Sequence, residues 1–349
     1  MSRRLVALVV LAQLLVLAWM ADEREWILRT GKVIFLRTAP VDPRDLFRGD
    51  FVRLQYEINS PRAETSEPVA TPDANSKRHE VVYTRLKPAG EGLYEADGVS
   101  STQPDDGVFL RGRTENSWRM GWRGIAHYFV SYGIEQLFVE QGSGQAIEDR
   151  RGTRGQMQVP MEVEVAIGAS GKALIRGYRW SRLGVKLEIL RRPAPRGRNV
   201  PPVQGAAPEA ASITPAPLSP KLRLTLANTS SEPLALIDPG EHCALHLVPT
   251  VMTKAAYPAA YDCAGVPATA DDVKTLAPGA TYAVDIDLSE PRWHLLAGGK
   301  PVEAGTLPPG TQFRLEYRAP APVADRVAPT TVWNGRLASQ AFNAQGMID

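Results

Sequence analysis

Three carboxylates lie close together near the beginning of the chain, in the segment VDPRDLFRGD at 41–50. They are Asp42, Asp45 and Asp50. Carboxylates at this spacing are suited to acid–base chemistry or to binding a divalent cation. Arg44, Arg48 and Arg53 are interleaved with them, however, and compete for the same oxygens as ion-pair partners. We therefore expect these acids mainly to cap turns and form ion pairs, and a hydrolase that uses them is kept as an alternative.

A second cluster combines tryptophans with arginines, in the segment SWRMGWRGIAHYFVSY at 117–132. Its candidate ligand-binding residues are Trp118, Arg119, Trp122, Arg123 and His127. In a strand the two tryptophans share one face and the two arginines share the other, because side chains alternate. Such a surface suits a glycan or a lipid headgroup, but tryptophans in a strand more often form the interior of a sheet. His127 lacks an evident catalytic partner and is expected to be structural, with a role in a hydrolase as the alternative.

The two cysteines, Cys243 and Cys263, both lie in the last third of the chain. Two cysteines in an oxidising compartment favour one disulfide, with free thiols and a metal site as the alternatives. If this segment is a strand, His242 and His246 share one face and Cys243 points to the other, which argues against a metal site. No cofactor is expected either, since the glycine-rich segment 141–145 lacks the spacing of a phosphate-binding loop.

The N-terminal segment is strongly apolar from residue 5 to residue 20, with Gln13 as its only polar member. Arg3 and Arg4 precede it, which predicts a transmembrane helix with a cytoplasmic N-terminus and all later residues outside the cytoplasm. The lipid bilayer would be contacted through residues 5–21. The alternative is a cleaved signal peptide, but a cut after Ala21 would place the large Trp19 at the −3 position.

The rest of the chain has the pattern of short strands. In the segment 51–58, Val52, Leu54, Tyr56 and Ile58 alternate with polar or outward residues, which predicts one strand. A short helix is expected at 144–151 and a glycine turn at 168–172. Further strands are expected at residues 32–37, 81–87, 92–95, 108–113, 117–123, 125–130, 134–139, 161–166 and 173–178.

Residues 191–220 contain eight prolines and few large apolar side chains, which predicts an extended linker. After it, turns such as Pro278-Gly279 and Pro309-Gly310 alternate with short strands. This second region resembles Ig-like accessory domains, which implies a β-sandwich at 221–349. The expected domains are a transmembrane anchor at 1–28, a mostly-β domain at 29–190, the linker and the sandwich.

The segment GDFVRLQY at 49–56 resembles the signature of the GDYXXLXY family of bacterial membrane-anchored proteins. Gly49, Asp50, Leu54 and Tyr56 match that signature, and Phe51 stands where the family has its first tyrosine. The blocks YFVSYGIEQLFVEQGSGQAIED and VEVAIGASGKALIRGY also resemble the family, so the resemblance covers about residues 1–190. It implies a single-pass protein of the bacterial inner membrane, a companion of multi-spanning membrane proteins, and no defined activity.

The resulting fold class is mainly β: an N-terminal transmembrane helix, a mostly-β domain with a short helix, and an Ig-like β-sandwich. The net charge of +2 does not indicate a nucleic-acid partner. The leading hypothesis is a membrane-tethered periplasmic accessory or scaffold protein that contacts another envelope protein without catalysis. Its possible interaction residues are Gly49, Asp50, Arg53, Leu54 and Tyr56. The alternatives are a module that binds envelope polysaccharide or lipid through the cluster at 118–128, and an envelope hydrolase.

Overall fold

The computed structural model divides the chain into two compact units, which are described separately. The first unit comprises Met1–Arg151 and Pro160–Ser181, and the second comprises Gly152–Val159 and Arg182–Asp349. The structure describes residues 3–38, 51–59, 80–118, 127–140, 142–153, 155–192, 219–250, 257–261, 263, 266–308, 310–320, 331–344 and 346–348.

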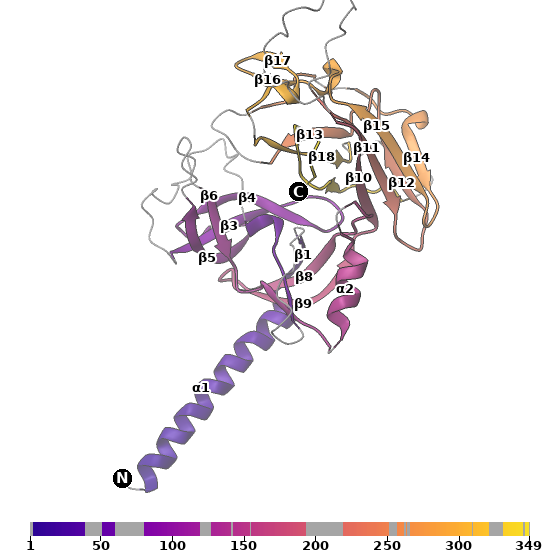
Figure 1. Cartoon of the computed structure of the whole chain (residues 1–349). Helices are drawn as coiled ribbons and strands as arrows, with labels where there is room; N and C mark the ends of the chain where they lie inside the picture. The colour runs from indigo at the N-terminus through magenta and orange to yellow at the C-terminus, as the bar shows by residue number, and fades with distance from the viewer. Residues whose placement is uncertain are drawn as a thin grey trace, which may run out of the picture. The chain divides into compact units, whose positions relative to one another are not determined.

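The first unit begins with the long helix α1 (Arg3–Thr30), shown in indigo in Figure 1. Its 28 residues correspond to a length of about 42 Å. The most apolar stretch of 18 residues has a mean hydropathy of 2.3, and none of it is buried within the protein. The helix is thus long and apolar enough to span a membrane.

The C-terminal turns of α1 pack on the turn between two strands of the first unit. Ile27 is buried, and the small residue Gly168 in that turn leaves room for its side chain. Lys172, in the same turn, forms an ion pair with Glu23 at 2.8 Å. The helix is therefore attached directly to the folded part of the first unit.

The body of the first unit consists of three antiparallel sheets and one short helix. One sheet has the order β1–β8–β9, formed by Lys32–Arg37, Met161–Ile167 and Ala173–Trp180. A four-stranded sheet has the order β4–β3–β5–β6, formed by Tyr94–Ser100, Val81–Pro88, Val108–Trp118 and His127–Ser131. The third sheet pairs β2 (Phe51–Arg53) with β7 (Gln136–Phe138), and α2 (Ser143–Arg151) follows. One core contains buried side chains from all three sheets, including Leu36, Leu110 and Leu137.

Two strand predictions in the first unit are wrong in their bounds. The motif strand does not continue to Ile58, because β2 ends at Arg53 and a single turn of 3₁₀ helix occupies Glu57–Asn59. The segments 108–113 and 117–123 were expected as two strands, but one strand, β5, continues from Val108 to Trp118. Leu54, Tyr56 and Ile58, which the alternation places on one face, are nevertheless all buried.

The second unit is built from strands and short 3₁₀ turns around a separate core. One sheet has the order β10–β11–β15, formed by Leu183–Arg191, Lys221–Asn228 and Thr281–Asp287. In a second sheet β18 (Gln312–Arg318) pairs with β13 (Leu245–Pro249), β19 (Arg336–Ala338) and β20 (Phe342–Asn343). Two-stranded sheets join β12 (Leu234–Ile237) to β14 (Val273–Leu276) and β16 (Leu295–Ala297) to β17 (Lys300–Val302). The 3₁₀ turns are Ala270–Asp272, Pro291–Trp293 and Ala304–Thr306. Leu187, Leu224, Leu245, Tyr317 and Trp333 share one core.

The division into units differs from the sequence-based domain bounds at strand β10. The sequence analysis assigned residues up to 190 to the first domain, whereas β10 pairs in antiparallel register with β11 of the second unit. Alternating buried residues such as Val185 and Leu187 identify a strand but not its partner. Most of the predicted linker, 193–218, lies outside the described residues.

Candidate functional site

The motif segment is held by the segment of the second sequence block that carries β7. Phe51, Val52 and Arg53 pair with Phe138, Leu137 and Gln136. The pairing continues past the end of β2, because the Leu54 amide donates to the carbonyl oxygen of Glu135 at 2.8 Å. Two parts of the sequence that resemble the family thus form one structural element.

Tyr56, the last residue of the motif, is almost completely buried, at 1% exposure. Its hydroxyl donates a hydrogen bond to the carbonyl oxygen of Ile134 at 2.7 Å. Burial, and to a smaller extent the charge of Glu135, raises the pKa of this hydroxyl far above its usual value. Tyr56 therefore remains protonated and serves as a hydrogen-bond donor.

Asn59 ends the motif segment and is fully buried. Its side-chain oxygen accepts the Tyr56 amide proton, which closes the turn that ends the extended segment. Its side-chain nitrogen donates to the carbonyl oxygen of Val130 at 2.6 Å and to Glu135 Oε1 at 3.3 Å. A buried amide with all these partners satisfied specifies one arrangement of the surrounding backbone.

Tyr132 provides a reciprocal contact from the second block. Its hydroxyl donates to the carbonyl oxygen of Ile58 at 2.9 Å and lies 2.8 Å from Thr84 Oγ1. Burial raises the pKa of this hydroxyl as well. The Glu135 carboxylate accepts the amide protons of Tyr132 at 2.6 Å and Gly133 at 2.9 Å. We call Tyr56, Asn59, Tyr132 and Glu135 the motif network.

On the other side of the motif strand, two residues are exposed among the described part of the chain. They are Arg53 and, in the neighbouring strand β7, Phe138, which is 78% exposed. The motif segment therefore has a buried face that fixes the fold and an outer face with exposed side chains.

Several predicted site residues lie outside the described residues. Gly49, Asp50 and the other two acids, Asp42 and Asp45, are among them. In the aromatic cluster Arg119, Trp122 and Arg123 also lie outside them. For Trp118 and His127 only the backbone is described: the two residues pair at the ends of β5 and β6. A ligand role for this cluster stays a prediction.

The predicted disulfide between Cys243 and Cys263 is confirmed, with the two Cα atoms 5.6 Å apart. The argument that placed His242 and His246 on one face of a strand is wrong, because β13 begins only at Leu245. His242 lies in a turn with a φ of 61°. Its Nδ1 is 2.7 Å from the buried carboxylate of Asp238, which also accepts the Tyr282 hydroxyl proton at 2.7 Å.

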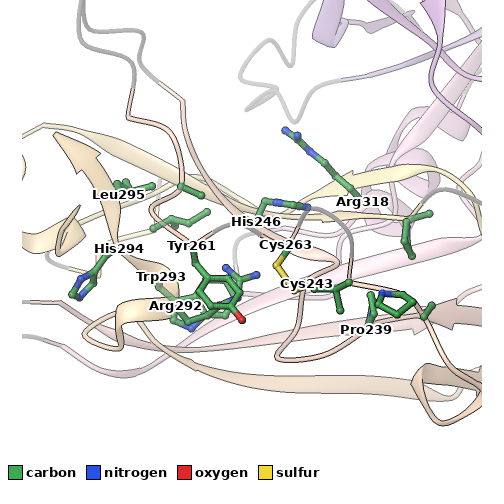
Figure 2. A pocket seen from close by; sticks show the side chains of 17 residues that line it. Pro239, Cys243, His246, Tyr261, Cys263, Arg292, Trp293, His294, Leu295 and Arg318 are labelled. Atoms are coloured by element: carbon green, nitrogen blue, oxygen red, sulfur yellow. A yellow bond between two sulfur atoms is a disulfide. The ribbon is translucent and has the colours of Figure 1, made fainter. Parts of the chain in front are cut away.

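A cavity of about 820 Å³ lies beside the disulfide in the second unit (Figure 2). Both cysteines contribute to its wall. The polar and aromatic side chains that line it are His246, Tyr261, Arg292, Trp293, His294 and Arg318. The sequence analysis did not predict this site, because its two arginines are 26 positions apart and no motif connects them. In the part of the chain that the structure describes, no group of three or more acids, histidines or cysteines is arranged to hold a metal ion.

In the comparison with protein families, residues 13–177, called the GDYXXLXY region below, match the model of the GDYXXLXY protein family. The GDYXXLXY region includes most of α1 and the complete motif network, whereas the disulfide and the cavity lie outside it. Neither the curated proteins nor the solved structures that were compared contain a match to this chain.

Proposed function

We propose that this chain is a single-pass membrane-anchored accessory protein whose folded units lie in the periplasm of a bacterium and contact another envelope protein. The observation that carries the proposal is the unbroken helix α1, which is apolar over its first part and attached to the folded unit at its last turns. A helix of this kind holds a soluble domain directly at the membrane surface.

The preceding arginines support an N-terminus in the cytoplasm, because positive residues are retained on that side. The disulfide supports a periplasmic location for the second unit, on the other side of the membrane from the N-terminus, since such bonds persist in the oxidising periplasm. Ile27 and Glu23, which lie beyond the apolar run, contact the turn between β8 and β9. Both residues follow Ala21, so the feature that favours a retained anchor is the helix itself, which continues without a break across residue 21 into the part that contacts the folded unit.

The interaction surface that we assign to the partner is the outer face of the β2–β7 pair. It presents Arg53 and the aromatic ring of Phe138 next to a core that the motif network keeps rigid. Exposed aromatic and arginine side chains are enriched at sites that bind other proteins. The buried side of the motif segment explains the presence of Leu54 and Tyr56, and the outer face carries the exposed side chains that we assign to recognition.

Photo-crosslinking in bacterial cells tests this proposal. A photoreactive amino acid is placed at Arg53 or Phe138, and a matched control is placed at Arg85, an exposed residue of strand β3. We expect discrete adducts with a membrane protein from the first two positions and none from Arg85. Adducts of equal strength from all three positions, or from none, would refute the proposed surface.

The anchor is tested separately by mass spectrometry of the protein extracted from membranes. We expect a mass of 38.1 kDa, which corresponds to the chain with its helix α1 retained. The protein should also stay in the membrane during alkaline extraction, and added protease should degrade it only after the outer membrane is opened. A mature chain that begins after Ala21 and is soluble would contradict the anchoring.

A further inference from the structure

The cavity in the second unit contains an arginine that is held in a fixed position. Arg292 donates hydrogen bonds to the carbonyl oxygens of Glu241, His242 and Leu245, each at 3.1 Å. Its guanidinium group also lies 4.9 Å from the ring centre of Tyr261 and 4.7 Å from that of Trp293. These partners orient the group and carry no formal negative charge. The nearby acids Asp238 and Glu241 favour its charged form, but neither of them lines the cavity.

A second arginine reaches the cavity from strand β18. Arg318 donates from Nε and Nη2 to one oxygen of Glu316, at 3.0 and 2.7 Å. The Glu316 carboxylate is almost completely buried and is also in contact with Arg336, at 3.0 Å. One negative charge is thus divided between two arginines, and only Arg318 of these two lines the cavity.

His246 lies between the two cationic groups in the close view of the cavity (Figure 2). Its neighbour in the paired strand is Glu316, directly opposite in register. Burial is the main cause that lowers the pKa of His246; the charge of Arg318 and, less strongly, that of Arg292 lower it further, while Glu316 raises it. The charged imidazole is therefore disfavoured mainly by burial and in addition by the two arginines.

The described residues that line the cavity include no aspartate and no glutamate. The remaining wall is mainly apolar, with the disulfide, Leu247 and Leu295 contributing to it. Burial also lowers the pKa of Arg292, so water solvates this charge less well than a charge at an open surface. A pocket with fixed, incompletely neutralised guanidinium groups and apolar walls is complementary to an anion with an organic body.

We infer that this cavity is a binding site for a small organic anion, whose carboxylate or phosphate group is held by Arg318 and Arg292 and whose body packs against the apolar wall. Guanidinium groups recognise both kinds of oxyanion, so the shared chemistry defines the ligand class. The neutral His246 adds a hydrogen-bond partner at the same place. This function is independent of the membrane anchor and of the partner surface on the first unit.

Isothermal titration of the full chain in a non-ionic detergent tests the inference with three probes: inorganic phosphate, glucuronate and neutral glucose. We expect saturable binding of at least one anion and no binding of glucose. Binding of phosphate alone identifies a phosphate ligand, and binding of glucuronate alone identifies a carboxylate ligand. Absence of binding for both anions up to about 20 mM, or equal binding of glucose, would overturn the inference.

Two arginine variants provide the matched comparison. Arg318→Gln removes a group that lines the cavity, and Arg223→Gln removes an exposed arginine of strand β11 that pairs with Asp285 and does not line the cavity. We expect Arg318→Gln to weaken anion binding at least about tenfold and Arg223→Gln to change it by less than about twofold. If Arg318→Gln does not fold, His246→Glu replaces it and should abolish binding by repulsion. An unchanged affinity in the folded cavity variant would refute the site.

Discussion

The Tyr56 hydroxyl donates to the carbonyl oxygen of Ile134, a residue 78 positions further along the chain, at 2.7 Å. The reciprocal bond from Tyr132 to Ile58 connects the same two segments in the opposite direction, 74 positions apart. Two tyrosines thus join the motif to the second block by side-chain bonds to backbone oxygens. This arrangement explains the presence of Tyr56 by the stability of the fold and requires no reaction at the motif.

Removal of one hydroxyl tests this structural role. In Tyr56→Phe the buried carbonyl oxygen of Ile134 loses its side-chain donor, and we expect the free energy of unfolding to fall by about 1–3 kcal/mol. Tyr178→Phe is the control, because its ring is 42% exposed, and it should change stability by less than about 0.5 kcal/mol. Urea denaturation of both variants and of the unaltered protein in detergent measures the free energies of unfolding. A Tyr56→Phe variant as stable as the unaltered protein would contradict the structural role of the Tyr56 hydroxyl.

The junction between α1 and β1 has no space for a side chain at Gly31. A Cβ atom there would lie 2.5 Å from the carbonyl oxygen of Ile27 and 2.9 Å from that of Ile167. We expect Gly31→Ala to destabilise the first unit by about 1–3 kcal/mol, because backbone atoms on both sides must shift. Gly144→Ala is the matched control: its Cβ meets nothing within 4 Å, and alanine favours the helix α2.

Hydrogen exchange at the end of α1 is the most direct readout of this change. The amide of Gly31 donates to the Ile27 carbonyl oxygen at 2.8 Å, and protection of this region should decrease in Gly31→Ala alone. Unchanged protection in both variants would show that the junction tolerates a methyl group.

The disulfide should stabilise the second unit selectively. Cys243 and Cys263 are separated by 20 positions, and opening a loop of this size costs about 3 kcal/mol in the chain-entropy description. We expect the double variant Cys243→Ser, Cys263→Ser to lower the unfolding midpoint of the second unit. Hydrogen exchange at the amides of β11 and β18 follows this unit selectively, and an unaltered midpoint would count against the expected stabilisation.

The stability of the second unit should depend on pH through His246. Because burial and the two arginines lower its pKa in the folded protein, the unfolded chain binds this proton at a higher pH than the folded chain does. The contribution of neutral His246 to the free energy of unfolding is thus complete above the ordinary histidine pKa of about 6.5. It decreases as the pH falls toward the pKa that His246 has in the folded protein.

His246→Gln removes this dependence. The variant should show a flatter stability profile just below pH 6.5, and the decline at lower pH should remain because Asp285 and Asp287 also have lowered pKa values. Denaturation at a series of pH values measures both profiles, and identical slopes for the two proteins would contradict the prediction.

The sequence predicted the features that depend on short-range patterns. The alternation placed Leu54, Tyr56 and Ile58 on one face, and all three are buried, although the strand itself ends earlier. The early end depends on Asn59, whose side chain closes a turn only because Val130 and Glu135 are brought to it by the fold. No local pattern contains that information.

The cavity in the second unit is even less predictable from local sequence patterns. Arg292 and Arg318 lie in separate strand and turn segments, and their convergence depends on the pairing of β13 with β18 and on the turn before β16. The disulfide was predictable because only two cysteines exist, whereas no comparable restriction identifies two arginines among 40 basic residues. The position of His242 in a left-handed turn also has no signal in the sequence, since only a few per cent of non-glycine residues adopt this conformation.

The ion pair between Glu23 and Lys172 and the contact of Ile27 with Gly168 join α1 to a strand turn without an intervening flexible segment. The folded part of the first unit should consequently change its orientation together with α1. In the anchored arrangement that we propose, a thinner bilayer that changes the tilt of α1 would turn the outer face of β2 and β7 through the same angle, so lipid composition would set the height of that face above the membrane.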